Sequence, residues 1–148
     1  MGVESGHRGS VSIEQRVAAP PDLVSAYVSD FRNAKEWMVG VDGVERLGED
    51  SYRLALDSPI GRIQPEVRIV EHTPESISWV YTSTIEGGGR VDVAPDADGC
   101  LVTYTGDFHL KRKLLDRAAR FVGAERFART NGERSLARLK SLMEARRY

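Results

Sequence analysis

Two carboxylates are the candidates for acid–base chemistry in this sequence. Glu125 falls on the apolar face of a predicted helix, and Asp107 precedes Phe108 near the end of an alternating segment. A carboxyl group held among apolar side chains has a raised pKa and can exchange protons at neutral pH. Arg129 lies four residues after Glu125, close enough on a helix to pair with it and keep it ionised. The alternation turns Asp107 outward, so Glu125 is the remaining catalytic candidate, and a surface carboxylate at a helix bend is the alternative.

Other catalytic and metal-binding chemistry has little support. The three histidines lack the i, i+4 helical spacing of a zinc motif, and His72 and His109 are expected in loops or at strand ends. Cys100 is the only cysteine, which excludes an intramolecular disulfide and a cysteine-based metal site. The segment from Glu86 to Gly89 is predicted to be a turn, because a phosphate-binding loop needs a preceding strand, a following helix and a lysine. We therefore expect no metal and no cofactor.

Aromatic side chains predict a binding cavity instead. Trp79 and Tyr81 share one face of a predicted strand, and Tyr104 and Phe108 share one face of another. The polar tips of buried tyrosine and tryptophan side chains need partners, whereas an ordinary apolar core is the simpler interpretation of each residue alone. The residues expected to line the cavity are Trp37, Tyr52, Leu54, Val67, Trp79, Tyr81, Tyr104, Phe108, Ala128 and Gly132.

Residues 112–148 are predicted to form one long helix. From Leu114 to Met143, apolar or small residues recur at steps of three and four, which is the spacing of one helix face. Ala128 and Gly132 make the middle of this face small and leave room for something else. Phe127 falls on the opposite side of the helix, so we expect a bend near residue 123, a glycine. Such a helix must lie on other elements, because its own propensity does not stabilise it.

The rest of the chain predicts an antiparallel sheet. Residues 10–17 alternate as a strand, and two short helices follow, the second ending at Gly40. Six further segments of period two are VDGVERLG, YRLALD, IGRIQPEVRIVEH, ESISWVYTS, GGRVDVAPD and CLVTYTGDFHL. The turn from Asp96 to Gly99 is the clearest hairpin, and Pro65 indicates an edge or a bulge. This order predicts an α+β fold: a curved seven-stranded antiparallel sheet wrapped around a long C-terminal helix, with two short helices between strands 1 and 2.

Length and charge limit the functions open to the protein. Its 148 residues suit one domain, which we place at 10–148 after a flexible N-terminus at 1–9. The formal net charge of -1 gives no electrostatic reason to expect nucleic acid or an anionic membrane surface as partner. The polar N-terminal residues predict neither a signal peptide nor a membrane span. We expect a cytoplasmic protein that is a monomer or a weak homodimer.

Several segments carry a resemblance that spans most of the chain. They are VAAPPDLV at 17–24, Trp37 followed by GVDGVE, TPESISW at 73–79, DADGCLVTY at 96–104 and ERSLARLKSLME at 133–144. With the order of elements, they resemble the helix-grip fold of START-related, birch-pollen-allergen-like (SRPBCC) proteins. Within that superfamily the chain is similar to the bacterial polyketide cyclase/dehydrase and lipid-transport group. The resemblance implies a cavity between sheet and helix that holds an apolar or aromatic small molecule.

Three functions are compatible with this resemblance. The first is binding or carrying a lipid-like or polyketide-like molecule. The second is an aromatase/cyclase or dehydratase acting by proton transfer in the same cavity, and the third is a module that docks on another macromolecule. Aromatic polyketide cyclases of this type look richer in pocket tryptophans and carry an arginine on the strand matching Gly61 to Glu71. This chain has Ile63, Pro65, Val67 and Ile69 there, which favours binding.

Overall fold

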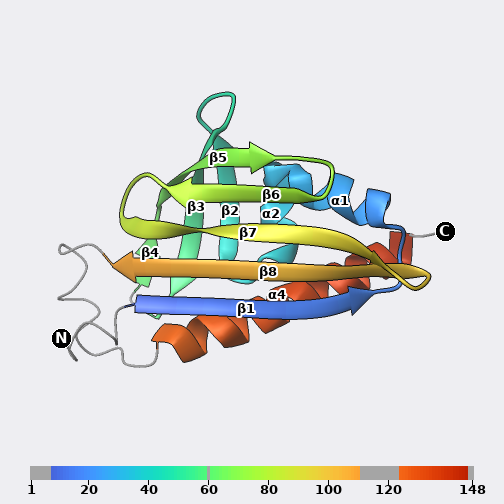
Figure 1. The fold of residues 1–148 in the computed structure, drawn as a ribbon. Helices are drawn as coiled ribbons and strands as arrows, with labels where there is room; N and C mark the ends of the chain where they lie inside the picture. Colours follow the sequence, from blue (N-terminus) through green and yellow to red (C-terminus); the bar gives the residue numbers. More distant parts are fainter. Residues whose placement is uncertain (1–7, 60, 111–123, 147–148) are drawn as a thin grey trace.

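The computed structural model describes residues 8–59, 61–110 and 124–146 (Figure 1). The elements are β1 (Arg8–Val17), α1 (Pro21–Ser29), η2 (Phe31–Asn33), α2 (Ala34–Trp37), β2 (Val41–Arg46), β3 (Ser51–Ser58), β4 (Gly61–Ile63), β5 (Glu66–His72), β6 (Ser76–Tyr81), β7 (Ile85–Asp96), β8 (Gly99–Leu110) and α4 (Ala124–Arg146). This order confirms the predicted α+β class. The first part of the predicted C-terminal helix, with the expected bend near residue 123, lies outside the described residues.

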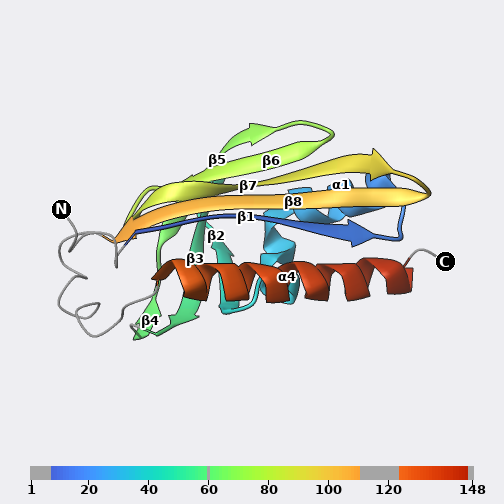
Figure 2. The same cartoon turned by 60° about the horizontal axis from the view of Figure 1, so that its bottom comes forward.

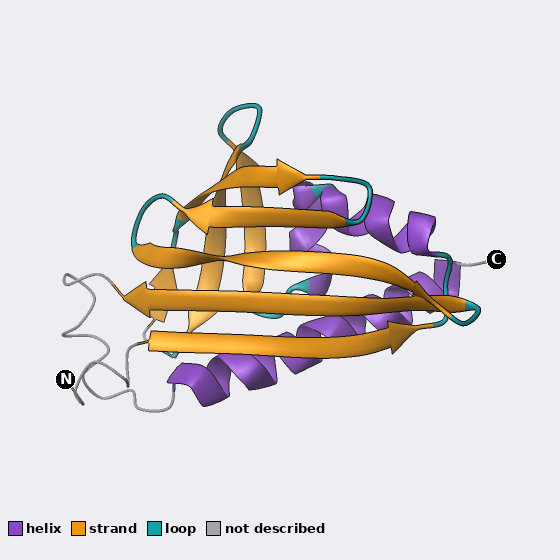
Figure 3. Ribbon diagram, in the orientation of Figure 1, coloured by secondary structure: helices purple, strands orange, loops and turns teal. Residues whose placement is uncertain are grey.

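All strand pairs are antiparallel, and the strands follow one another across the sheet in the order β1-β8-β7-β6-β5-β3-β2 (Figure 3). Short β4 pairs with β3 beside this path. β7 and β8 form the predicted hairpin, in which Asp96 pairs with Gly99 and Ala97 has a positive φ of 52°. Figure 2 shows the sheet curling, so that β2, β3 and β4 reach down toward α4.

Two predictions about strand boundaries are wrong. Residues 86–89 are not a turn: they belong to β7, and the chain turns earlier, around Thr84, which has a φ of 73°. The predicted segment IGRIQPEVRIVEH is two strands, β4 and β5, because it breaks at residues 64 and 65. Pro65 lacks the N–H that a continuous ladder needs, so the strand ends there, although its carbonyl still accepts from the N–H of Leu54 at 2.9 Å.

The core lies between the concave face of the sheet and the helices. α1 begins at Pro21 with Asp22 in its first turn and buries Val24, Tyr27 and Val28. On α4 the predicted stripe is confirmed where it is described, because Leu136, Leu139 and Met143 are fully buried. In Figure 2, α4 runs along the concave side of the sheet, next to β1 and β8. The helix therefore closes the sheet as the sequence pattern predicted.

The C-terminal end of α4 contacts the segment from the end of β1 to α2. The hydroxyl of Tyr27 donates a hydrogen bond to Glu36, and the guanidinium of Arg146 lies 4.8 Å from the centroid of the Tyr27 ring. Glu144 accepts a hydrogen bond of 2.8 Å from the backbone N–H of Ala18. These contacts hold one end of the helix against α1, α2 and the end of β1.

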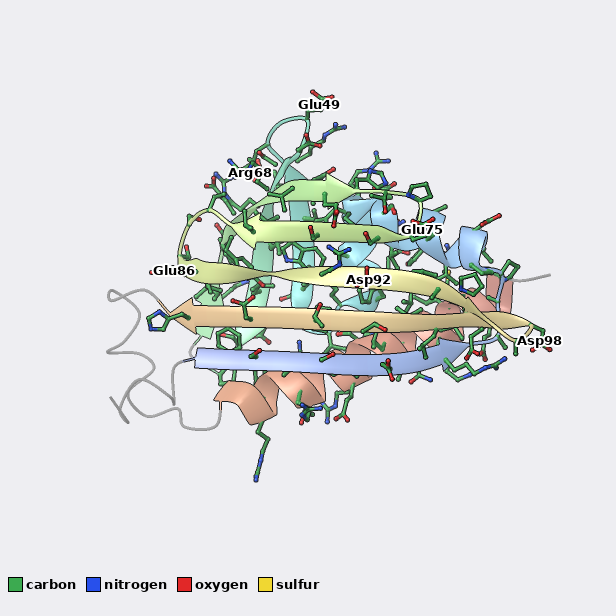
Figure 4. The ribbon with its side chains drawn as sticks, in the orientation of Figure 1. Glu49, Arg68, Glu75, Glu86, Asp92 and Asp98 are labelled. Atoms are coloured by element: carbon green, nitrogen blue, oxygen red, sulfur yellow. The ribbon has the colours of Figure 1, made fainter. Side chains whose placement is uncertain are left out.

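Charged side chains lie on the outside of the sheet. In Figure 4, Glu86 and Asp92 project from β7, whereas Glu49 and Asp98 stand at turns. On this outer face Arg90 binds Asp92 through its Nε at 3.0 Å. The opposite, concave face is apolar, and the candidate site lies there.

Candidate functional site

A cavity of about 180 Å³ lies between the concave face of the sheet and α4. Its lining comes from the α2–β2 segment, β3, β4, β6, β7, β8 and α4. The described lining residues are Phe31, Trp37, Met38, Val39, Val41, Leu54, Leu56, Ser58, Pro59, Ile63, Trp79, Tyr81, Ile85, Tyr104, Phe108, Phe127, Ala128, Asn131, Gly132 and Ser135. Residues that share a strand face and residues of the helix thus meet in one space, as expected from their periodicity.

Most of the predicted lining residues border this cavity. They are Trp37, Leu54, Trp79, Tyr81, Tyr104, Phe108, Ala128 and Gly132. Tyr52 and Val67 lie outside the lining and belong to the core. The Tyr52 ring packs against Phe31, with ring centroids 5.2 Å apart, and Val67 is fully buried. At Tyr52 the concave face is covered by Phe31 of η2, in the segment after α1.

Two glycines make a hollow in the sheet beside the cavity. Gly89 of β7 lies opposite Gly106 of β8 in the antiparallel register. A Cβ atom on Gly89 would lie 2.4 Å from Cζ2 of Trp79, and a Cβ atom on Gly106 would lie 2.6 Å from the hydroxyl oxygen of Tyr104. The two rings stack over this pair, with centroids 6.5 Å apart and an angle of 25° between their planes. Only glycine leaves enough space for both rings here.

The hydroxyl groups of Tyr81 and Tyr104 are removed from water. Both side chains remain partly accessible because their rings border the cavity, whereas burial of the hydroxyls raises the pKa of each. The negative charge of Asp107 acts in the same direction on both, and the indole N–H of Trp79 partly offsets the rise by hydrogen bonding to Tyr81. Both hydroxyls therefore stay protonated at neutral pH and can donate hydrogen bonds.

Two polar side chains on α4 hold the segment between α2 and β2, which forms part of the cavity wall. The side chain of Asn131 donates to the carbonyl oxygen of Val39 at 2.7 Å, and the hydroxyl of Ser135 accepts from the N–H of Val39 at 2.9 Å. Gly40 follows with a φ of 94°, which lets the chain turn into β2. Both backbone polar groups of Val39, its N–H and its carbonyl oxygen, are thus satisfied by the helix.

This arrangement corrects two predictions about α4. Phe127 was predicted on the side away from the sheet, yet it lines the cavity together with Asn131 and Ser135. These residues are spaced by four, so they form a second face that meets the curled end of the sheet. Gly132 was predicted to leave room for a ligand; it borders the cavity, but the position of its missing side chain is filled. A Cβ atom there would lie 2.5 Å from Cδ1 of Ile13, so this glycine permits close packing on β1.

Sequence comparison places the chain in a family. The family model for polyketide cyclase/dehydrase and lipid transport matches residues 8–144. The protein belongs to this family. No curated protein matches its sequence.

Solved structures of other proteins share this fold. The aromatase/cyclase Zhui from Streptomyces sp. R1128 is 19% identical with a TM-score of 0.75, covering 95% of this chain and 96% of that one. A START superfamily protein from Mycobacterium smegmatis is 18% identical with a TM-score of 0.67, covering 96% and 97%. The di-domain aromatase/cyclase StfQ of the steffimycin pathway is 15% identical with a TM-score of 0.72. The alignment covers 98% of this chain and 53% of StfQ, so this chain spans about half of that protein.

The described lining of this family member carries no charged side chain. Asp107 is exposed on the outer face of β8, as predicted, and the side chain of Glu125 is outside the described part of the molecule. His72 is exposed at the end of β5 and His109 lies near the end of β8. Within the described ranges, no group of three or more His, Cys, Asp or Glu residues could hold a metal ion. None of the described helices is long and apolar enough to cross a membrane.

Proposed function

We propose that the protein binds and carries a neutral apolar or aromatic small molecule in the cavity between the sheet and α4. The observation that carries this proposal is the composition of the described lining, which is apolar and aromatic with a few uncharged polar groups. An ionised ligand would lose its hydration there without gaining a charged partner among the described residues, which is costly. A neutral ligand gains from burying its apolar surface and meets no such penalty.

The size of the cavity supports a compact ligand. An engineered cavity of about 150 Å³ in another protein is large enough for benzene. A cavity of about 180 Å³ accordingly suits one or two rings with short substituents rather than a long acyl chain. The family's polyketide and lipid ligands indicate the chemical class, and the volume favours its smaller members.

Aromatase/cyclase or dehydratase activity is the second candidate, because similar folds occur in proteins named aromatase/cyclases. Such chemistry requires a group that gives or takes a proton at the ligand. Among the described lining residues, the titratable side chains are Tyr81 and Tyr104, and burial raises the pKa of both. They can donate hydrogen bonds at neutral pH but do not act as bases. A carrier needs no such base, and we therefore prefer binding.

Docking on another macromolecule has less support. That role needs an exposed apolar patch. Among the described residues, the exposed large apolar side chains are Leu47 in the β2–β3 turn and Val70 on β5. Single exposed apolar residues at separate places are ordinary for a protein surface.

Native mass spectrometry of the protein purified from its own host tests the proposal. We expect the folded wild-type protein to carry an extra mass that is released on denaturation. Ala128→Leu should remove it by filling the cavity, because Ala128 lines that space, whereas Ala137→Leu on the exposed side of α4 should retain it. A wild-type protein without bound mass, or equal loading of the two variants, would contradict the proposal.

A further inference from the structure

The Tyr104 hydroxyl is a polar group in the cavity wall that has no partner among the described residues. It points over Gly106, and it makes no hydrogen bond to another described residue. A hydroxyl removed from water without a partner lowers stability, so such groups mark places where a ligand or a bound water completes the bonding. The ring lies beside Trp79, with ring centroids 6.5 Å apart.

A second hydroxyl is directed into the same part of the cavity. Tyr81 lies two residues after Trp79 on the same face of β6 and also lines the cavity. Its hydroxyl donates to no other described residue, so the hydroxyl proton remains available for a ligand. The Tyr104 side chain points along β8 toward Gly106. Its hydroxyl therefore lies toward the end of the cavity where Tyr81 is found.

Two hydroxyl donors at one end of a cavity whose described lining is uncharged indicate the chemistry of the ligand. A carbonyl oxygen has two lone pairs and can accept from both. We propose that the ligand is a neutral ring compound whose carbonyl oxygen accepts hydrogen bonds from Tyr104 and Tyr81, while its ring fills the apolar remainder of the cavity. This inference rests on the proposed binding function and adds the position and type of the polar group.

Three ligands of nearly equal shape test the inference by NMR or calorimetric titration. Acetophenone carries the carbonyl, α-methylstyrene replaces its oxygen with a CH₂ group, and benzoate replaces the methyl ketone with a carboxylate. We expect the wild-type protein to bind acetophenone about fivefold more tightly than α-methylstyrene, the effect of about one net hydrogen bond, and to bind benzoate least.

Variants that remove single hydroxyls locate the polar site. Tyr104→Phe should weaken acetophenone binding about fivefold and leave the affinity for α-methylstyrene unchanged or higher. Tyr81→Phe should act in the same direction. Tyr52→Phe is the control, because it removes a tyrosine hydroxyl from a residue outside the cavity lining, and it should preserve the preference.

Each other outcome contradicts a defined part of the inference. If α-methylstyrene binds as tightly as acetophenone, or if Tyr104→Phe keeps the wild-type preference, the hydroxyl site is wrong and the binding function stands. If benzoate binds best, the ligand is an anion and its neutrality is wrong. If wild-type protein binds none of the three and also carries no mass from its host, the proposed function itself fails.

Discussion

Gly89 of β7 lies directly opposite Gly106 of β8, and the space left by their missing side chains is occupied by the rings of Trp79 and Tyr104. The pair sits in the interior of two long strands, where glycine otherwise weakens a sheet by its flexibility and lack of packing surface. The packing of two aromatic rings against the sheet offsets this loss of stability. These glycines therefore determine the shape of the binding site, although neither is among the residues that line it.

Gly106→Ala should impair binding more than folding. The new methyl group would lie 2.6 Å from the Tyr104 hydroxyl and would push the phenol ring toward the cavity. Because a side-chain end can move, we expect the free energy of unfolding to fall by only about 1–2 kcal/mol. Affinity for acetophenone should fall about tenfold, since the displaced ring occupies ligand space. Urea unfolding and titration of the same preparations measure the two effects.

Gly43→Ala is the matched control for this substitution. Gly43 is also a strand glycine, in β2, but a Cβ atom there would meet only Cβ of Ala55 at 3.8 Å, an ordinary contact. This variant should bind acetophenone as the wild type does. Equal losses of affinity in the two variants would show that the effect comes from backbone stiffening rather than from the Tyr104 ring.

The sequence could not reveal this feature of the site. Three consecutive glycines after Glu86 predict a turn, because glycine is most frequent where the chain reverses. In the structure they lie in β7, where Gly87 has a φ of 109° and Gly88 and Gly89 are approached closely by the backbone and ring of Trp79. A run of glycines can form a turn or can let other groups approach a strand closely. The choice between them depends on contacts from β6 and β8, which the local sequence does not reveal.

Ser135→Ala should loosen the wall of the cavity next to β2. It removes the acceptor for the Val39 N–H, and with it a hydrogen bond of 2.8 Å that the hydroxyl donates to the Asn131 carbonyl. We expect the free energy of unfolding to fall by about 1–2 kcal/mol, because an N–H group is left without its partner in a partly buried segment. Amide hydrogen exchange at Val39 should become faster. Both changes can be followed on protein without ligand.

Ser141→Ala provides the comparison on the same helix. Ser141 is exposed, so its replacement should change the free energy of unfolding by no more than about 0.5 kcal/mol. If Ser135→Ala were as stable as Ser141→Ala, with unchanged exchange at Val39, the bonds between α4 and the α2–β2 segment would contribute nothing to the wall.

Stability should decrease in alkaline solution because of the buried tyrosines. Burial raises the pKa of Tyr81 and Tyr104 above the ordinary value of 10.0, so above pH 10 the unfolded chain loses protons that the folded protein keeps. The free energy of unfolding then falls with rising pH, by up to about 1.4 kcal/mol per pH unit for each group, and is unaffected by them below pH 9 or so. Urea unfolding between pH 8 and 11 should show this slope.

The contribution of one group can be separated by substitution. Tyr104→Phe removes a hydroxyl that titrates only in the unfolded state, so the decline above pH 10 should become shallower. A variant with the full wild-type slope would mean that the Tyr104 hydroxyl is exposed to water in solution, which would also contradict its role as a buried donor.

Much of the fold could be predicted because its elements have distinct periods. Alternation in residues 10–17 and in the segments after Gly40 gave strands whose faces were assigned correctly, as buried Ile13, Trp79 and Val102 confirm. The helical stripe through Leu136 and Met143 was equally clear. The second face of α4 was missed, because Phe127, Asn131 and Ser135 differ too much in polarity to form an apolar pattern. Their common role appears only when the curled sheet brings β2 next to the helix.

Glu125→Gln separates a carrier from an enzyme. Arg129 lies one helical turn after Glu125, so we expect the two side chains to pair on α4 and the glutamate to serve as a structural charge. The ligand carried from the host should then have the same mass in Glu125→Gln as in the wild type, and Glu133→Gln on the exposed side of α4 should match both. If Glu125 instead transferred protons in a dehydration, the variant would accumulate the unconverted precursor, heavier by one or more water molecules. Native mass spectrometry of the three proteins from one host distinguishes these results, and an unchanged mass would leave binding without catalysis as the function of the cavity.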